Sequence, residues 1–299
     1  MKAVVKQFVP PILWESIQRL KAALQPLPKD VEAVAGSHRL RVPNGHKIGI
    51  VGVSQPYRNL AVGIIAKYAG EKYRDRCMVD VGANVGDTGA MMASYCSNPL
   101  VLVDPSDTYF GYLRCNASLF TNPVTLVKGI VAGEGSVRGT LVHEGGTARI
   151  RQGGANNVGF EQFKLSELGD GNACFVKIDT DGFDYEIIQS SGDFLERVHP
   201  VVYWEGEVSS HEELATADAT AKFLQDRGYT RFAIWDDPGF FLLSTDDVSV
   251  LGQLHRYLFE VGKHTYRRSI FNYNIAAFHA TDGDVADRVV AHFESINEA

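Results

Sequence analysis

The sequence predicts an α/β protein whose doubly wound, mostly parallel sheet is covered by helices on both faces. Between residues 77 and 227, short apolar runs typical of strands alternate with segments of helical periodicity. A glycine-containing turn follows the first of these runs, at residues 82–86. Four of the runs end in an acidic residue: Asp80, Asp104, Asp179 and Glu205. Because open α/β sheets bind ligands outside the carboxyl ends of their strands, we expect a ligand site at this edge.

The first 75 residues are expected to form a helical extension and a lead-in to a core domain of residues 76–299. Residues 8–25 have the periodicity of an amphipathic helix that opens with two prolines. Its polar face is not strongly basic, so we favour a helix docked on the protein over a membrane-surface or substrate-gating helix. Residues 47–53 then predict a strand, and residues 59–69 predict a helix that a glycine ends.

The turn at residues 82–86 has the layout of a nucleotide-sized site. Residues 78–81 form a short apolar strand, and a helix is expected from residue 86 to residue 97. Gly82 lets a ligand approach the backbone closely, while Asn84 is one of the few residue types that tolerate a positive φ. Asp80 at the strand end would be costly to bury unless it is paired or hydrogen-bonded. We therefore favour a ligand site here over an ordinary strand-turn-helix corner.

The spacing of this turn is Asp-x-Gly-x-Asn-x-Gly, from Asp80 to Gly86. It fits poorly to the Gly-x-Gly-x-x-Gly fingerprint by which dinucleotide enzymes bind a pyrophosphate. An acid two residues before the first glycine suits a ligand with a cationic amine and no phosphates, such as S-adenosylmethionine. A dinucleotide oxidoreductase is therefore the weakest of the functions considered.

A second strand, residues 100–104, ends in Asp104. An acid at this place binds both hydroxyls of a ribose in comparable folds. A helix over 107–119 and a strand over 124–128 are expected to follow. The glycine-rich region 134–160 differs from the rest and predicts a β-hairpin insertion, formed by residues 139–143 and 148–151, with a mobile loop at residues 153–154. Such an insertion often shapes a substrate pocket.

The fourth strand, residues 173–179, is almost continuously apolar and is therefore expected at the centre of the sheet. Asp179 closes it, and Asp181 follows in a segment that is expected to begin a helix. Glu205 ends the next strand, residues 200–205, and His211 follows in the loop after it.

The rest of the chain completes the alternation. The expected elements are a helix over 212–227, a strand over 230–235, a helix near 249–260 within a mostly loop region 236–270, a strand over 273–279 and a closing amphipathic helix over 284–296.

Composition excludes several classes of protein. The formal net charge of −7 argues against a nucleic-acid-binding surface. No apolar run reaches the length of a bilayer span, and residues 1–20 fit a signal peptide poorly. The 4 cysteines have no metal-ligand spacing and predict buried, reduced thiols in a cytoplasmic protein. A peripheral position at the inner face of a membrane stays open.

Three segments together carry a resemblance to a known family. They are Val79-Asp-Val-Gly-Ala-Asn-Val-Gly-Asp-Thr88, Val103-Asp-Pro105 and Val176-Lys-Ile-Asp-Thr-Asp-Gly182. With them, the chain resembles the FkbM family of S-adenosylmethionine-dependent methyltransferases over about residues 76–210. The family usually has Glu at the places of Asp181 and Asp104, and both changes keep the charge. The resemblance implies a class I (Rossmann-like) methyltransferase fold and O-methylation of a small-molecule or glycan acceptor, in the family a sugar hydroxyl or a natural product.

The turn and the acids are expected to bind different parts of the cofactor. We expect Asp104 to bind the ribose, and Ile130 and Val131 to pack on the adenine. Arg58 either reaches a ligand carboxylate or lies in solvent. The methionine end, which becomes that of S-adenosylhomocysteine after transfer, is assigned to Asp80, Gly82, Ala83, Asn84, Gly86, Asp87 and Thr88.

For the general base, two alternatives stay open: Asp179 with Asp181, or His211, whose ordinary pKa suits the task. A third version places a divalent cation between Asp179 and Glu205 and ranks below metal-free transfer. A catalytically silent binding or scaffold protein in a biosynthetic complex is the alternative to an enzyme. The acceptor and the oligomeric state do not follow from the sequence.

Overall fold

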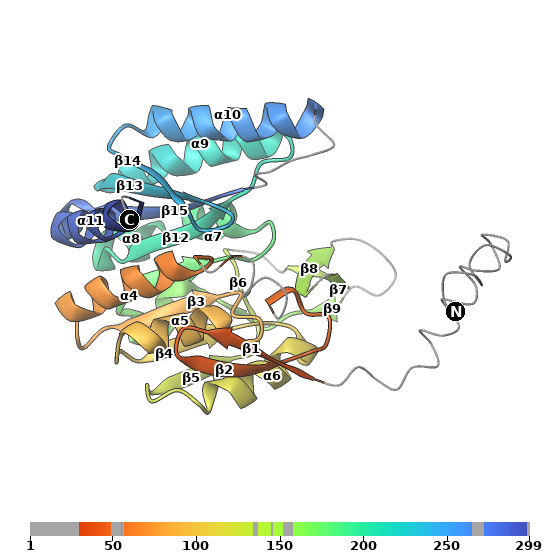
Figure 1. Cartoon of the computed structure of the whole chain (residues 1–299). Coiled ribbons are helices and arrows are strands. Elements are labelled where there is room, and N and C mark those ends of the chain that lie inside the picture. The colour runs from red at the N-terminus through yellow and green to blue at the C-terminus, as the bar shows by residue number, and fades with distance from the viewer. Residues whose placement is uncertain are drawn as a thin grey trace, which may run out of the picture.

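The computed structural model describes residues 30–48, 55, 57–133, 137–144, 146–151, 158–264 and 272–297 (Figure 1). The helix predicted over 8–25, the loop at 153–154 and most of the strand predicted over 47–53 lie outside these residues.

An eight-stranded sheet forms the middle of the molecule, in the order β14-β13-β15-β12-β11-β3-β4-β5 (Figure 1). The strands from β12 to β5 are parallel to one another, whereas β15, β13 and β14 are antiparallel to their neighbours. Their bounds are β3 Cys77–Val81, β4 Leu100–Val103, β5 Val124–Val127, β11 Ala173–Ile178, β12 Val201–Gly206, β13 Tyr229–Asp236, β14 Phe241–Thr245 and β15 Tyr273–His279.

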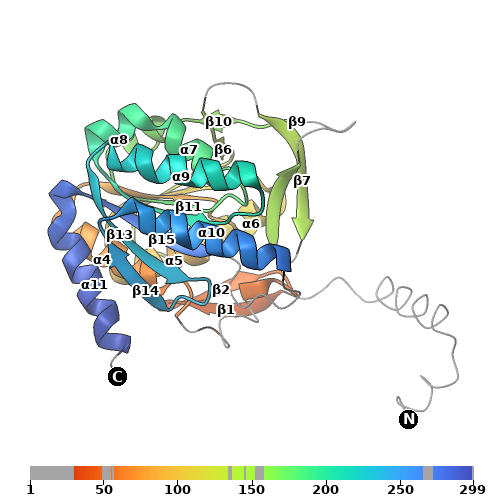
Figure 2. The same cartoon turned by 90° about the horizontal axis from the view of Figure 1, so that it is seen from above.

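Helices cover both faces of this sheet (Figures 1 and 2). One face carries α4 (Leu60–Lys72), α5 (Asp87–Tyr95), α6 (Asp107–Ala117) and α11 (Gly283–Asn297). The other carries α7 (Asp184–Ser190), α8 (Gly192–Val198), α9 (His211–Gln225) and α10 (Val248–His264). Short 3₁₀ turns lie at Leu165–Glu167, Gly169–Gly171 and Ala280–Asp282.

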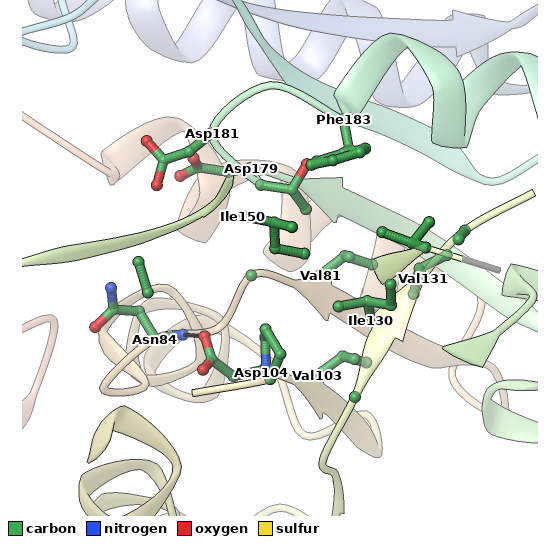
Figure 3. Close-up of a pocket in the computed structure, with 17 residues that line it drawn as sticks. Val81, Asn84, Val103, Asp104, Ile130, Val131, Ile150, Asp179, Asp181 and Phe183 are labelled. Carbon is green, nitrogen blue, oxygen red and sulfur yellow. Dashed lines mark hydrogen bonds between the residues drawn. The ribbon is translucent and has the colours of Figure 1, made fainter. Parts of the chain in front are cut away.

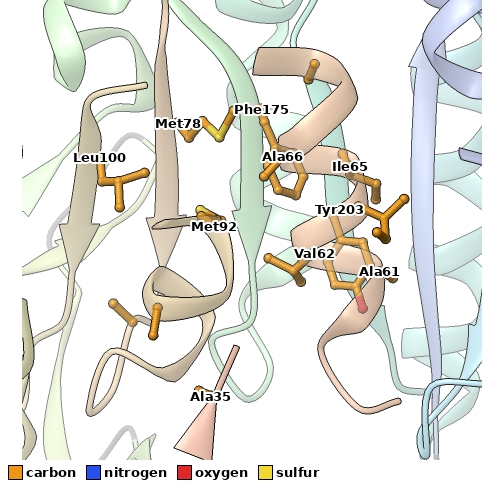
Figure 4. Close-up of a cluster of buried hydrophobic side chains, with 14 of the residues drawn as sticks. Ala35, Ala61, Val62, Ile65, Ala66, Met78, Met92, Leu100, Phe175 and Tyr203 are labelled. Atoms are coloured by element: carbon orange, nitrogen blue, oxygen red, sulfur yellow. The ribbon is translucent and has the colours of Figure 1, made fainter. Parts of the chain in front are cut away.

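Successive side chains along a strand point to opposite faces of the sheet, so they enter two different hydrophobic cores. In β4, Leu100 and Leu102 pack into the core under α4 and α5, whereas Val101 and Val103 pack into the core under α7 to α9. Figure 4 shows the first core, where Met78 and Phe175 of the sheet meet side chains of α4 and α5. A strand that is buried on both faces is almost wholly apolar, which is why these strands are easy to recognise in the sequence.

The predicted fold class, a doubly wound and largely parallel sheet with helices on both faces, is confirmed. Several predicted elements match closely, among them the strand at β15 and the hairpin of β7 (Arg138–Glu144) and β8 (Thr147–Arg151). The cysteine prediction holds in part: none of the four is in a disulfide, but Cys115 is exposed.

Three details differ from the predictions. The chain forms a hairpin of β1 (Val31–Ala35) and β2 (His38–Val42), which was not predicted although its buried residues alternate. Strand β14 lies in the region predicted to be mostly loop, and it is only half-buried at the sheet edge. The strand prediction is wrong at Lys47 and Ile48, which are helical and follow a turn in which the N–H of His46 donates to the carbonyl of Pro43.

Two small β-structures complete the described chain. Strands β6 (Ile130–Val131) and β10 (Gln162–Phe163) pair in parallel, and β9 (Val158–Gly159) pairs with β7. Figure 2 shows β7 and β9 on the side of the sheet opposite to α11. The hairpin of β7 and β8 lies beside the carboxyl ends of β3 and β4, since Ile150 of β8 lines one cavity with Val81 and Val103.

Candidate functional site

The glycine turn has the strained geometry that its sequence predicts. Gly82 has a φ of +81°, and a Cβ placed on it would lie 1.8 Å from the carbonyl oxygen of Asp179. Only glycine fits this close approach of two strand ends, because any side chain would push them apart. The turn is thereby held against the end of β11.

Asn84 links this turn to the next strand. Its φ is 51°, and its backbone N–H donates a 2.9 Å hydrogen bond to Oδ2 of Asp104. The other carboxylate oxygen of Asp104 accepts a 2.8 Å hydrogen bond from the N–H of Ser106. Asp104 is thus oriented by backbone on both sides while its carboxylate still lines a cavity.

That cavity lies outside the carboxyl ends of β3, β4 and β11 (Figure 3). Its apolar wall is formed by side chains that the structure brings together from five separate segments: Val81, Val103, Ile130, Val131, Ile150 and Phe183. Asp104 lies on one side of it, and Asp179 and Asp181 lie on another (Figure 3). An apolar slot with one oriented carboxylate suits a planar base joined to a hydroxylated sugar.

Burial raises the pKa of Asp104 to about 7, although the N–H groups of Ser106 and Asn84 lower it. The carboxylate of Asp104 therefore titrates nearer to neutral pH than an ordinary aspartate does. Hydroxyl groups that donate to it would favour the ionised form.

The hairpin of β7 and β8 forms one side of the cavity, which Ala148 and Ile150 of β8 line. The side-chain amide of Asn84 donates a 2.9 Å hydrogen bond to the carbonyl of Gly146 in the hairpin turn. On β7, Nε2 of His143 lies 2.8 Å from the hydroxyl of Ser106. These contacts dock the hairpin on the two loops that carry the turn and Asp104, so that Ile150 faces the cavity.

A polar cleft adjoins the apolar cavity. The two spaces share Gly82, Asn84, Asp179 and Asp181. The remaining lining of the cleft includes basic and polar side chains from the turn, β11 and the segments before α4: His46, Lys47, Arg58, Asn59, Asp87, Thr88 and Lys177. The pair of spaces therefore has one apolar end and one polar end, with Asp179 and Asp181 at the junction.

Lys177 connects the acids beneath this junction. Its ammonium lies 3.1 Å from Oδ1 of Asp80 and 3.3 Å from Oδ2 of Asp179. Burial opposes the charge on Lys177, but the carboxylates of Asp179, Asp80 and Asp87 outweigh it and raise the pKa of the ammonium.

Asp80 is fully buried and is not part of the lining of either space. Its Oδ2 accepts a 2.5 Å hydrogen bond from the hydroxyl of Thr88, and its Oδ1 faces Lys177. The acid that the sequence analysis assigned to the ligand is thus already paired within the protein. Its direct effect is on Lys177 and on the helix that begins at the turn.

Arg58 lines the polar cleft rather than lying free in solvent. Its guanidinium contacts Asp237 at 3.2 Å and the side chain of Gln55 at 3.1 Å. The next residue, Asn59, donates a 3.0 Å hydrogen bond to Asp87 in the first turn of α5.

Asp181 has a φ of 54°, an uncommon conformation for a residue other than glycine. Nε of Arg149, on β8, lies 3.2 Å from its carboxylate. Burial and the nearby Asp179 raise the pKa of Asp181 despite this guanidinium. A carboxylate with a raised pKa is a stronger base, which is useful where a hydroxyl must lose a proton.

The other base candidate, His211, and the candidate metal ligand Glu205 line neither space. His211 is the first residue of α9, and its ring packs edge-on against Phe259 at 4.5 Å; it lines neither space. Glu205 accepts a hydrogen bond from Asn272, and burial, reinforced by Asp179 and Asp184, raises its pKa well above the usual range. Within the part of the chain that the structure describes, no group of three or more potential ligands has the arrangement of a metal site.

Some lining residues were missed by the sequence analysis. Phe183 follows the Lys177–Gly182 segment directly and could have been found there as an apolar residue next to two acids. Lys47 and Ile150 reach the site from segments with no motif, so only the fold reveals them. None of the described helices is both long and apolar enough to cross a membrane.

A comparison with protein families identifies one that matches the sequence. The methyltransferase FkbM domain family matches residues 80–231, just over half of the chain. No curated protein matches the sequence.

The solved structures that resemble the chain include the following three. The methyltransferase FkbM of Methylobacillus flagellatus KT is 14% identical over 71% of this chain and 48% of that one, with a TM-score of 0.43, so the chain spans about half of its length. A precorrin-6y C5,15-methyltransferase of Geobacter metallireducens GS-15 is 17% identical over 71% and 86% of the two chains, with a TM-score of 0.35. TYW2 of M. jannaschii, crystallised with AdoMet, is 10% identical over 85% and 87%, with a TM-score of 0.42.

Proposed function

This chain belongs to the FkbM family of methyltransferases, and we propose that it transfers the methyl group of S-adenosylmethionine to a hydroxyl of a sugar, polysaccharide or natural product. The observation that carries the proposal is the pair of adjoining spaces, one apolar with Asp104 and one polar, that meet at Asp179 and Asp181. The choice of a hydroxyl acceptor rests on the family resemblance and on the acids at this junction.

In this proposal the adenosine occupies the apolar cavity. Ile130, Val131 and Phe183 pack on the adenine, and the oriented carboxylate of Asp104 accepts hydrogen bonds from the ribose hydroxyls. The match between an apolar slot and a planar base supports this orientation. S-adenosylhomocysteine, the product, fits in the same way.

The methionine end extends into the polar cleft. The backbone of Gly82 to Gly86 approaches it closely, and Asp87, Thr88 and Arg58 complete its surroundings. Asp80 acts as a positioning residue, because its carboxylate holds Lys177 and Thr88 rather than the ligand. The sulfonium methyl is then directed toward the junction of the two spaces.

Transfer is an in-line displacement, so alignment of the acceptor oxygen, the methyl carbon and the sulfur supplies much of the rate. The new C–O bond forms as the S–C bond breaks, and the sulfonium becomes a neutral thioether. We assign the hydroxyl proton to Asp179 or Asp181, since both line the junction and their carboxylates are accessible. His211 is a weaker candidate because it lines neither space.

A transfer assay tests this function. The protein is incubated with S-adenosylmethionine labelled in its methyl group and with a panel of hydroxylated glycans and natural products. We expect label in an ether that is stable to base, and we expect its loss in the Asp179→Asn Asp181→Asn double variant, with cofactor binding retained. Binding of the cofactor without transfer to any acceptor would favour a catalytically silent scaffold in a biosynthetic complex.

The location of the enzyme is part of the same proposal. We place it in the cytoplasm, where its cofactor is made, either free or at the inner face of a membrane. Fractionation of cells that express the tagged chain tests this, and recovery from an extracytoplasmic fraction would contradict it.

A further inference from the structure

We propose that the acceptor carries an oxyanion, a carboxylate or a phosphate, which binds in a basic groove beside the methyl-transfer site. This inference rests on the proposed function, since it names the chemistry of the acceptor. The basic groove is lined by Lys47 and by side chains of the β7–β8 hairpin and the loop after β11: Val142, Thr147, Arg149, Ile150, Arg151 and Asp181.

The basic groove opens at the place where transfer would occur. Asp181 lines the groove, the apolar cavity and the polar cleft alike. Ile150 separates the groove from the apolar cavity and lines both. A molecule lying in the groove therefore reaches Asp181 from the side that the cofactor does not occupy.

The groove is lined by three basic side chains, although the protein as a whole is acidic. The chain has a formal net charge of −7, and acids gather at the transfer site itself. Yet Lys47, Arg149 and Arg151 converge on one groove. Arg149 is held by Asp181 and by Glu207, at 3.2 Å each. Within the described residues, Lys47 and Arg151 have no carboxylate within ion-pair distance, and both are exposed.

Uncompensated cations next to an acidic site favour one kind of acceptor. A neutral sugar has no charge for Lys47 and Arg151 to attract. An anionic acceptor would be repelled by Asp179 and Asp181 if these two cations did not offset the repulsion. Arginine is well suited to hold a carboxylate or a phosphate, because its guanidinium presents two parallel donors. An acidic sugar or a sugar phosphate satisfies both the groove and the transfer site.

The methionine carboxylate of the cofactor is a competing anion, and Lys47 lines the polar cleft as well as the groove. Arg151 separates the two, because it lines the groove but not the cleft. The test therefore depends on Arg151, with the cofactor site already filled.

The experiment uses the full chain saturated with S-adenosylhomocysteine and follows the binding of glucose, glucuronate and glucose 6-phosphate by saturation-transfer NMR and calorimetry. We expect both anions, or one of them, to bind more tightly than glucose. The better anion identifies the source of the charge as carboxylate or phosphate. In Arg151→Gln we expect this binding to weaken about tenfold, which corresponds to about 1.4 kcal/mol.

Arg74→Gln is the matched control. It removes the same charge from an exposed position just before β3, at the end of that strand away from the site. It should leave the binding of the anions unchanged, and neither variant should alter the affinity for S-adenosylhomocysteine. Equal binding of glucose and the anions, absence of anion binding, or an unchanged affinity in Arg151→Gln would each overturn the inference. Failure of S-adenosylhomocysteine to bind would instead contradict the proposed function.

Discussion

Removing one partner of the buried ion pair between Asp80 and Lys177 should destabilise the protein strongly. The side chains are 0% and 3% exposed, and their charged atoms lie 3.1 Å apart. In Lys177→Met, the hydroxyl of Thr88 is the one partner that the carboxylate of Asp80 keeps among the described residues. An uncompensated buried charge of this kind costs about 3–5 kcal/mol in the free energy of unfolding.

The double variant Asp80→Leu Lys177→Met tests whether the cost arises from the unpaired charge. Replacing both partners by apolar side chains of similar volume is often neutral or stabilising. We therefore expect the double variant to recover most of the loss seen in Lys177→Met. Recovery would also show that the pair is kept for the site rather than for stability, since Lys177 also contacts Asp179.

Urea unfolding followed by circular dichroism measures these changes. Lys222→Met is the matched control, because Lys222 pairs with Asp226 on the exposed face of α9, with side chains 59% and 55% exposed. An exposed pair of this kind contributes only about 0.3–0.5 kcal/mol. A loss below about 1 kcal/mol in Lys177→Met, or no recovery in the double variant, would refute the reasoning.

Three further predictions concern the cofactor site and the metal dependence of methyl transfer. Since the pKa of Asp104 is raised to about 7 and the ribose favours its ionised form, the affinity for S-adenosylhomocysteine should be constant above pH 7 and fall about tenfold per pH unit below it; calorimetry at several pH values should show this in the wild type and not in Asp104→Asn. Gly82→Ala should destabilise the fold by at least about 1–3 kcal/mol and abolish cofactor binding, because its φ is +81° and its Cβ would meet the carbonyl of Asp179; unchanged thermal unfolding would contradict this. Treatment with EDTA should leave methyl transfer unchanged, and a loss that Mg²⁺ restores would instead support a cation between Asp179 and Glu205.

The sheet was predictable from the sequence because its strands are buried on both faces. Val79, Val101 and Val176 belong to short runs that are almost wholly apolar, and a run of that length and composition between turn residues is typical of a central parallel strand. The glycine turn was predictable for a different reason, since a close backbone approach leaves glycine as the only choice at residue 82.

The rest of the site depends on contacts between distant segments. Asp80 and Lys177 are both visible in the motifs, but their pairing follows only from the register of β3 and β11, which sets them side by side. Ile150 reaches the cavity because the hydrogen bond from Asn84 to Gly146 and the contact between Ser106 and His143 dock the hairpin. Such docking does not follow from any local sequence pattern. The sequence therefore predicted the hairpin but not which of its side chains line the site.

His211 was proposed from its chemistry and its place in the sequence, and the fold places it away from the site. Its ordinary pKa and its place after a strand made it a reasonable candidate base, but the start of α9 directs its ring onto Phe259. A residue type with suitable chemistry is not evidence of position, and position is decided here by how α9 packs on α10.

Calorimetry of S-adenosylhomocysteine binding at pH 8 tests the central claim most directly. We expect the wild type to bind one molecule per chain and Asp104→Ala to bind at least about tenfold more weakly, as the loss of charge-assisted hydrogen bonds to the ribose requires. Absence of binding to the wild type, or equal affinity in Asp104→Ala, would contradict the assignment of this cavity to the cofactor.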